Sequence, residues 1–165
     1  MRRDETMTDQ PENKLVQMTP GGQMSEAHAD HAKPRSQGQL VEFRVPARLE
    51  SLAVVRTLVS ALGTLEDLDL DAVADLRLAL DEACTRLIRS AAPDSTLVVE
   101  VEPRETDLRI TVSTTCVGDD ILRAGTFSWH VISSLTDDVQ TFRDGADPGG
   151  VFGITMIARR LEADR

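Results

Sequence analysis

The sequence predicts an α+β protein in which two or three helices pack on one face of a mostly antiparallel sheet. Segments with strand and helix patterns follow one another in the order β–α–α–β–β–α–β–β. In the helical segments apolar residues recur every three or four positions, and 41% of the 165 residues are hydrophobic. That fraction is enough to fill a core between the two layers of such a sandwich.

Residues 1–38 differ in composition from the rest of the chain. They contain no aromatic residue and a single aliphatic pair, Leu15–Val16, while three Pro and three Gly interrupt them. Such a segment cannot bury enough apolar surface to offset the entropy lost on ordering. We therefore predict a disordered tail over 1–38 and a folded domain over 39–165.

The first half of the domain is predicted to hold one strand and two helices. Apolar and polar residues alternate over 40–45, as in a half-buried strand that Pro46 ends. Residues 47–63 have the helical repeat, with Gly63 placed as a C-terminal cap. The second helix is predicted over 71–91, before Pro93. The apolar positions of the two helices are Leu52, Val55, Leu58, Val59 and Leu62, then Val73, Leu76, Leu80, Ala83, Leu87 and Ile88.

The second half is predicted to add two strand pairs and a short helix. Residues 95–102 and 107–116 form a hairpin around the turn 103–106. A helix follows over 126–135, and strands over 139–144 and 150–159 end the domain.

Composition excludes several functional classes. The formal net charge of −10 opposes binding to a phosphate backbone, so we expect no direct nucleic-acid partner. The sequence contains no apolar run long enough for a membrane span and no export signal. We therefore expect a cytoplasmic protein in which Cys84 and Cys116 are free thiols. Gly145 and Gly150 have the spacing of a phosphate-binding loop, but its lysine is absent, and no Cys/His spacing suits zinc.

The segment "LALDEACTRLI", residues 78–88, resembles the N-box helix of the RsbW-type anti-sigma factors. These are protein-serine kinases of the GHKL (histidine-kinase-like) ATPase superfamily. "SLTDDV" at 134–139 and "GGVFGITMIARR" at 149–160 resemble later segments of that family, so the resemblance spans about residues 40–160. It is strongest to the mycobacterial and actinobacterial branch that acts on a stress-response sigma factor. The resemblance implies a Bergerat-type fold.

The resemblance also assigns roles to single positions. Glu82 takes the place of the catalytic glutamate, and Arg86 stands where the family has the asparagine that holds Mg²⁺ beside ATP. The remaining nucleotide-binding positions would be Gly118, Asp119, Gly125, Thr126 and Ser128. Arginine has no lone pair for a metal, and the side chains at 126 and 128 replace family glycines. Glu82 and Arg86 are therefore either a degenerate active site or a surface ion pair four residues apart.

The family's biology implies the partners. They are an alternative sigma factor, an anti-anti-sigma antagonist of the STAS type that would release it, and a second copy of the chain in a homodimer. The predicted contact residues are Glu50, Arg56, Glu66, Asp67 and Asp69, each of which is alternatively an ordinary solvated charge. Three functions stay open: a sequestering regulator with a degenerate nucleotide site, an active ATP-dependent protein-serine kinase that phosphorylates the antagonist, and an acidic α+β interaction module unrelated to transcription.

Overall fold

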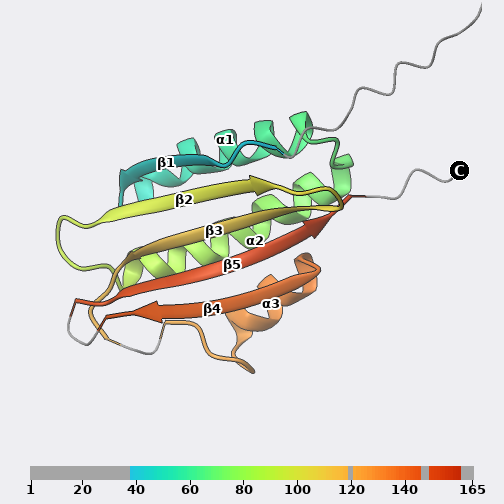
Figure 1. Ribbon diagram of the computed structural model, residues 1–165. Helices are drawn as coiled ribbons and strands as arrows, with labels where there is room; N and C mark the ends of the chain where they lie inside the picture. The colour runs from blue at the N-terminus through green and yellow to red at the C-terminus, as the bar shows by residue number, and fades with distance from the viewer. Residues whose placement is uncertain (1–37, 119–120, 146–148, 161–165) are drawn as a thin grey trace, which may run out of the picture. The chain divides into compact units, whose positions relative to one another are not determined.

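A computed structural model describes residues 38–118, 121–145 and 149–160. Within these residues the chain forms one antiparallel sheet of five strands in the order β1-β2-β3-β5-β4 (Figure 1). The last strand in sequence thus lies inside the sheet, between β3 and β4. The strands are β1 Val41–Pro46, β2 Thr96–Pro103, β3 Asp107–Thr115, β4 Asp138–Asp144 and β5 Val151–Arg159.

All helices of the described residues lie on one face of this sheet (Figure 1). After a single 3-10 turn, Leu49–Ser51, they are α1 Leu52–Leu65, α2 Leu70–Arg89 and α3 Phe127–Leu135. The two-layer α+β sandwich predicted from the element order is confirmed. No helix in this part of the chain is both long and apolar enough to cross a membrane.

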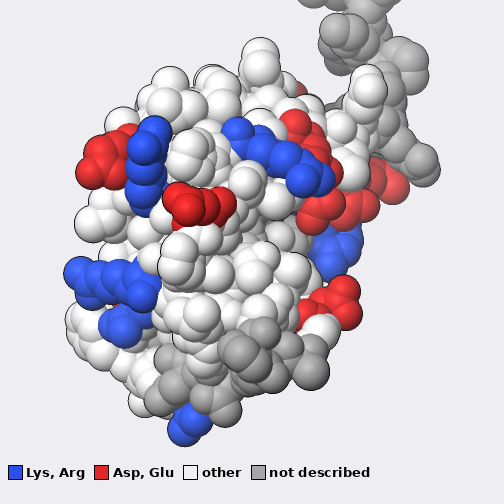
Figure 2. Space-filling model, turned by 90° about the vertical axis from the view of Figure 1, so that its left-hand side faces the viewer, with Lys and Arg blue, Asp and Glu red and all other residues white. Residues whose placement is uncertain are grey.

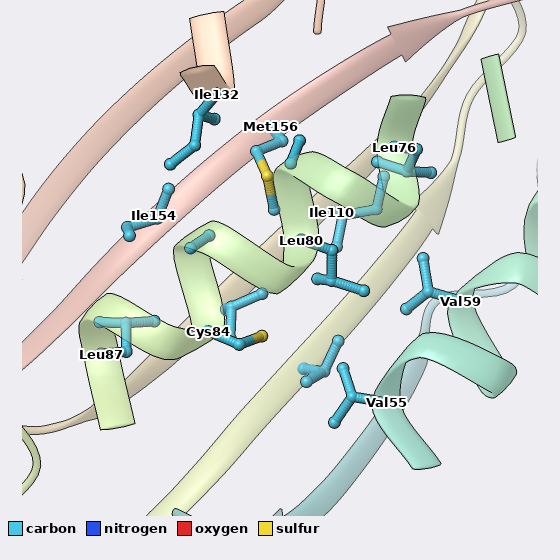
Figure 3. Packing of buried hydrophobic residues seen from close by; sticks show 14 of the residues in the cluster. Val55, Val59, Leu76, Leu80, Cys84, Leu87, Ile110, Ile132, Ile154 and Met156 are labelled. Carbon is cyan, nitrogen blue, oxygen red and sulfur yellow. The ribbon is translucent and has the colours of Figure 1, made fainter. Parts of the chain in front are cut away.

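The longest helix, α2, lies over the middle of the sheet and holds the core together. The Asp69 carboxylate caps its first turn by accepting from the Ala72 N–H at 2.8 Å. Apolar residues then recur along one side of α2, and Figure 3 shows Leu80 pointing toward Ile110 of β3 and Met156 of β5. The residues of α2 that are almost fully buried are Leu76, Ala79, Leu80, Ala83, Cys84 and Leu87. Val73 and Ile88, predicted in the same stripe, are only partly buried.

Among the described residues, the other face of the sheet carries no helix (Figure 1), and its side chains are mostly polar, as in many one-sided antiparallel sheets. The hydroxyls of Thr111 and Thr155, paired across β3 and β5, lie 3.1 Å apart. Beside them the Phe142 ring of β4 covers the space above Gly153, where any side chain would collide with it. A shallow hollow of about 360 Å³ on this face is lined by Leu40, Glu100, Glu102, Arg109, Thr111, Phe142 and Thr155.

Three local expectations were wrong. Gly63 does not end α1, because it lies inside the helix and lets α1 approach Leu68 and Val73, and Glu66 is the C-terminal cap. Leu58, expected among the recurring apolar residues of α1, is 40% exposed. Cys116 lies beyond β3, in a single bridge with Ala91. The predicted tail falls, except for Gly38, outside the described residues, so its disorder stays a prediction.

Candidate functional site

The candidate nucleotide site lies where the last turns of α2 face the start of α3, at the end of the domain viewed in Figure 2. In that view acidic and basic side chains are interspersed, and neither charge dominates the surface. Helix α2 contributes Glu82, Arg86 and Arg89, since positions three and four apart share one side of a helix. Helix α3 contributes Ser128 from its first turn.

Glu82 and Arg86 form the ion pair that their spacing predicts. The Arg86 Nε donates to Glu82 Oε1 at 3.1 Å, and the side chains are 40% and 26% exposed. A partly exposed pair of this kind contributes about 0.3–0.5 kcal/mol to helix stability. The ion pair is therefore present in the structure, and the degenerate active site at the same two residues stays a prediction.

Glu82 remains ionised at neutral pH. The Ser128 hydroxyl lowers the pKa of the Glu82 carboxyl, partial burial raises it, and Arg86 and Arg89 lower it further, so that the net shift is downward. A carboxylate stabilised in this way is a weaker base than an ordinary glutamate. This disfavours Glu82 as the group that removes a proton from an attacking hydroxyl.

Ser128 fills part of the space between the two helices. Its side chain is 1% exposed, and its hydroxyl oxygen has no partner that meets the full geometry of a hydrogen bond. The oxygen nevertheless lies near enough to Glu82 to lower the pKa of the carboxyl. A buried hydroxyl without a full hydrogen-bond partner costs free energy of folding.

The residues just before α3 form the N-terminal cap of this helix. The Thr126 hydroxyl accepts from the Trp129 N–H at 3.3 Å and donates to the Arg123 carbonyl at 2.8 Å, so Thr126 is the helix N-cap. Gly125 precedes it with a φ of 86°, which glycine adopts without strain. Thr126 thus begins the predicted third helix as its cap.

The loop after β3, which contains Gly118, is hydrogen-bonded to strand β4. Gly118 has a φ of 100°, and its carbonyl accepts from Arg143 Nη2 at 2.8 Å. Asp119, the other predicted residue of this loop, lies outside the described residues.

The described residues do not fit a magnesium nucleotide. Mg²⁺ takes oxygen ligands, but Arg86 offers only donors, and the one carboxylate beside it is tied to that arginine. In the three described stretches, no cluster of three or more His, Cys, Asp or Glu is placed to hold a metal ion. No catalytic step through bound ATP can therefore be built from these residues.

Four of the five predicted partner contacts lie at the two ends of α1. Glu50 is exposed in the 3-10 turn before the helix. Glu66, Asp67 and Asp69 lie in the connection to α2, roughly 21 Å away at the helical rise per residue. Arg56, the fifth predicted contact, lies within α1 between these two groups.

Several of these charges have intramolecular partners, which sequence reasoning missed. Arg56 donates to both oxygens of Asp81 on α2, at 3.1 and 2.6 Å, and so joins the two helices. The Glu66 carboxylate accepts a hydrogen bond from Arg160 Nη2 at 2.7 Å. The same arginine donates from Nη1 to the Arg104 carbonyl at 2.6 Å. The partners are 25 and 94 residues apart in sequence, and no local pattern marks such pairs.

The two cysteines and His130 add no further site. Cys84 and Cys116 are free thiols with 0% exposure, and Cys84 is part of the hydrophobic core. Burial, with a smaller effect from Asp81, raises the pKa of Cys84 to about 12, so the thiol is unreactive. His130 is exposed on α3.

The family model described as the histidine kinase-like ATPase domain matches residues 45–158, and the fold of the described residues agrees with it. The chain is also 52% identical over 169 aligned positions to the anti-sigma-F factor RsbW of two Mycobacterium tuberculosis strains, CDC 1551 / Oshkosh and ATCC 25618 / H37Rv. That alignment covers 96% of this chain and 100% of each relative. The chain therefore belongs to the RsbW-type anti-sigma factors of the histidine kinase-like ATPase superfamily.

A solved structure agrees on the fold. It contains the RsbU and RsbW domains of a Mycobacterium tuberculosis protein, and it matches 77% of this chain with a TM-score of 0.58 at 18% identity. The match covers 35% of that longer chain, and at this identity it bears on the fold alone.

Proposed function

We propose that this protein sequesters an alternative, stress-response sigma factor through its surface and needs no nucleotide turnover to do so. The observation that carries the proposal is the ion pair between Arg86 and Glu82 at 3.1 Å, in the place where a kinase of this family needs a metal ligand. The 52% identity to an anti-sigma-F factor over its full length supports the class of partner.

The described geometry supports binding without catalysis. Helices α1 and α2 are joined by the bidentate Arg56–Asp81 pair, and α2 is capped and packed along its length. Inhibition by covering a surface of the sigma factor requires no chemical step. An antagonist of the STAS type would then release the sigma factor by competing for the same surface. We further propose that the protein acts as a homodimer in the cytoplasm.

Calorimetric titration tests the proposal directly. The purified protein is titrated with ATP and with ADP, each with and without Mg²⁺, and separately with alternative sigma factors of the same organism. We expect clear heat with the sigma factor and no Mg²⁺-dependent heat with either nucleotide. Tight Mg²⁺-dependent ATP binding, together with phosphate transfer to the antagonist, would instead establish the active serine kinase. Binding to neither ligand would refute the proposed sequestering function.

Two variants show whether position 86 by itself closes the site. Arg86→Asn restores a side-chain oxygen that can accept or coordinate, whereas Arg89→Asn removes one positive charge three residues further along without changing position 86. Mg²⁺-dependent ATP binding gained by the first variant and absent from the second would identify Arg86 as the block. If both variants gained Mg²⁺-dependent ATP binding, the effect would come from the loss of positive charge and not from position 86.

A further inference from the structure

Helix α2 carries an apolar stripe on the side that faces away from the sheet. Leu78 stands two positions from each of the buried residues Leu76 and Leu80, so at 3.6 residues per turn it lies roughly 200° around the helix from both. Leu70 and Ala74 continue this outer side at a spacing of four residues. All three are exposed, Leu70 by 81% and Leu78 by 57%. The outer side of a helix in a folded domain is ordinarily polar, so aligned apolar residues there suit a binding partner.

The stripe projects from a rigid part of the domain. Helix α2 packs between α1 and α3 in the helical layer (Figure 1). The Asp69 cap fixes its first turn, and the bidentate Arg56–Asp81 pair fixes its middle to α1. Leu68, 6% exposed, anchors the chain just before the helix. A partner that binds this face would therefore lose little free energy to ordering of the helix.

Unpaired carboxylates border the stripe on the side of α3. Asp75 precedes Glu82 by about two helical turns and so lies on the same side of α2 as that residue. The Glu82 carboxyl lies near Ser128 of α3, which identifies the side. Asp71 stands one turn before Asp75 on this side. Within the residues that the structure describes, neither Asp71 nor Asp75 takes part in an ion pair, and both are exposed.

The charge of this region defines the chemistry of the partner. Residues 66–82 contain seven carboxylates and a single basic residue, Arg77. The complementary surface is an amphipathic helix with apolar residues every three or four positions and Lys or Arg along one side. Segments that bind the phosphates of DNA carry such basic residues. A sigma factor contacts promoter DNA and therefore offers a surface of this kind.

We propose that the outer face of α2 binds a basic amphipathic helix from the DNA-contacting surface of the sigma factor. This face is formed by Leu70, Ala74 and Leu78 with the bordering Asp71 and Asp75. The two carboxylates then take the place of DNA phosphates, so that the sigma factor cannot hold this protein and its promoter at once. The inference rests on the proposed function and specifies the surface that each partner uses.

Calorimetric titration of the full chain with the alternative sigma factor, at several salt concentrations, provides the test. Leu78→Asp places a charge within the stripe, and Asp75→Lys places a positive charge against the basic helix. Each variant should weaken binding on the order of tenfold or more. The affinity of the unaltered chain should fall as salt rises, and that of Asp75→Lys should fall less steeply. A urea midpoint close to that of the unaltered chain shows that each variant is folded.

Matched controls lie on the other face of the sheet. Leu40→Asp and Glu100→Lys make the same chemical changes at residues that line the hollow on the polar face, and neither should alter sigma binding. Undiminished binding by both α2 variants, or equal losses in the controls, would overturn the inference and leave sequestration intact. Absence of binding by the unaltered chain would overturn the proposed function and this inference with it.

Photo-crosslinking identifies the segment of the partner that is bound. A photoreactive phenylalanine derivative in place of the exposed Ala74 should cross-link to a sigma-factor segment rich in Lys and Arg, identified by mass spectrometry of the joined peptides. Cross-links only to a second copy of this chain, or to a sigma-factor segment without an excess of Lys and Arg, would overturn the inference.

Discussion

Truncation of Leu80 to alanine tests whether α2 is the element that positions the candidate site. Leu80 is 0% exposed and lies in the centre of α2, two residues before Glu82, where it packs against the sheet. Replacing a fully buried leucine by alanine costs about 2.7–5.0 kcal/mol, depending on how far the surroundings collapse into the space. The neighbours Ile110 and Met156 belong to paired strands, so collapse is limited and we expect about 3–4 kcal/mol.

Urea denaturation followed by circular dichroism measures this loss as a lower midpoint at unchanged slope. Leu78→Ala is the matched control, since it makes the same substitution on the same helix at a residue 57% exposed, and it should change the free energy of unfolding by less than about 0.5 kcal/mol. Equal losses in the two variants would refute the orientation of α2 and with it the position of Glu82. A sigma factor that binds only the folded state should raise both midpoints.

Three further predictions concern the site. Ser128→Ala should raise the pKa of Glu82, measured by carboxyl NMR titration, because the serine hydroxyl is the largest cause of the downward shift; an unchanged pKa would remove Ser128 from the site. The Glu82→Gln variant should have a lower free energy of unfolding than the unaltered protein, because the ionised Glu82 carboxylate is favoured in the folded state. This difference should be fully present above about pH 4.5 and should disappear as the pH falls through the lower pKa of Glu82 in the folded protein. A difference that does not depend on pH would contradict the lowered pKa. Cys84, with a pKa of about 12, should resist iodoacetamide at pH 8 in the folded protein and react in denaturant; rapid alkylation of the folded chain would contradict its burial.

The sequence predicted those features that depend on neighbouring residues. Hydrophobic periodicity located every strand and helix of the described residues to within a few positions, because burial of one side imposes a period on the chain. The Glu82–Arg86 pair was predicted for the same reason, since four residues make one helical turn. The family resemblance also rested on continuous segments, and the match over residues 45–158 bears it out.

Features that join distant parts of the chain were decided by the tertiary structure alone. The insertion of β5 between β3 and β4, the Glu66–Arg160 ion pair and the approach of Ser128 to Glu82 each join residues that are far apart in sequence. Gly63 was misjudged because its role depends on a helix packed beside it, not on its own conformation. Local patterns thus determined what each segment becomes, whereas packing determined which side chains meet, because only the closed core fixes those distances.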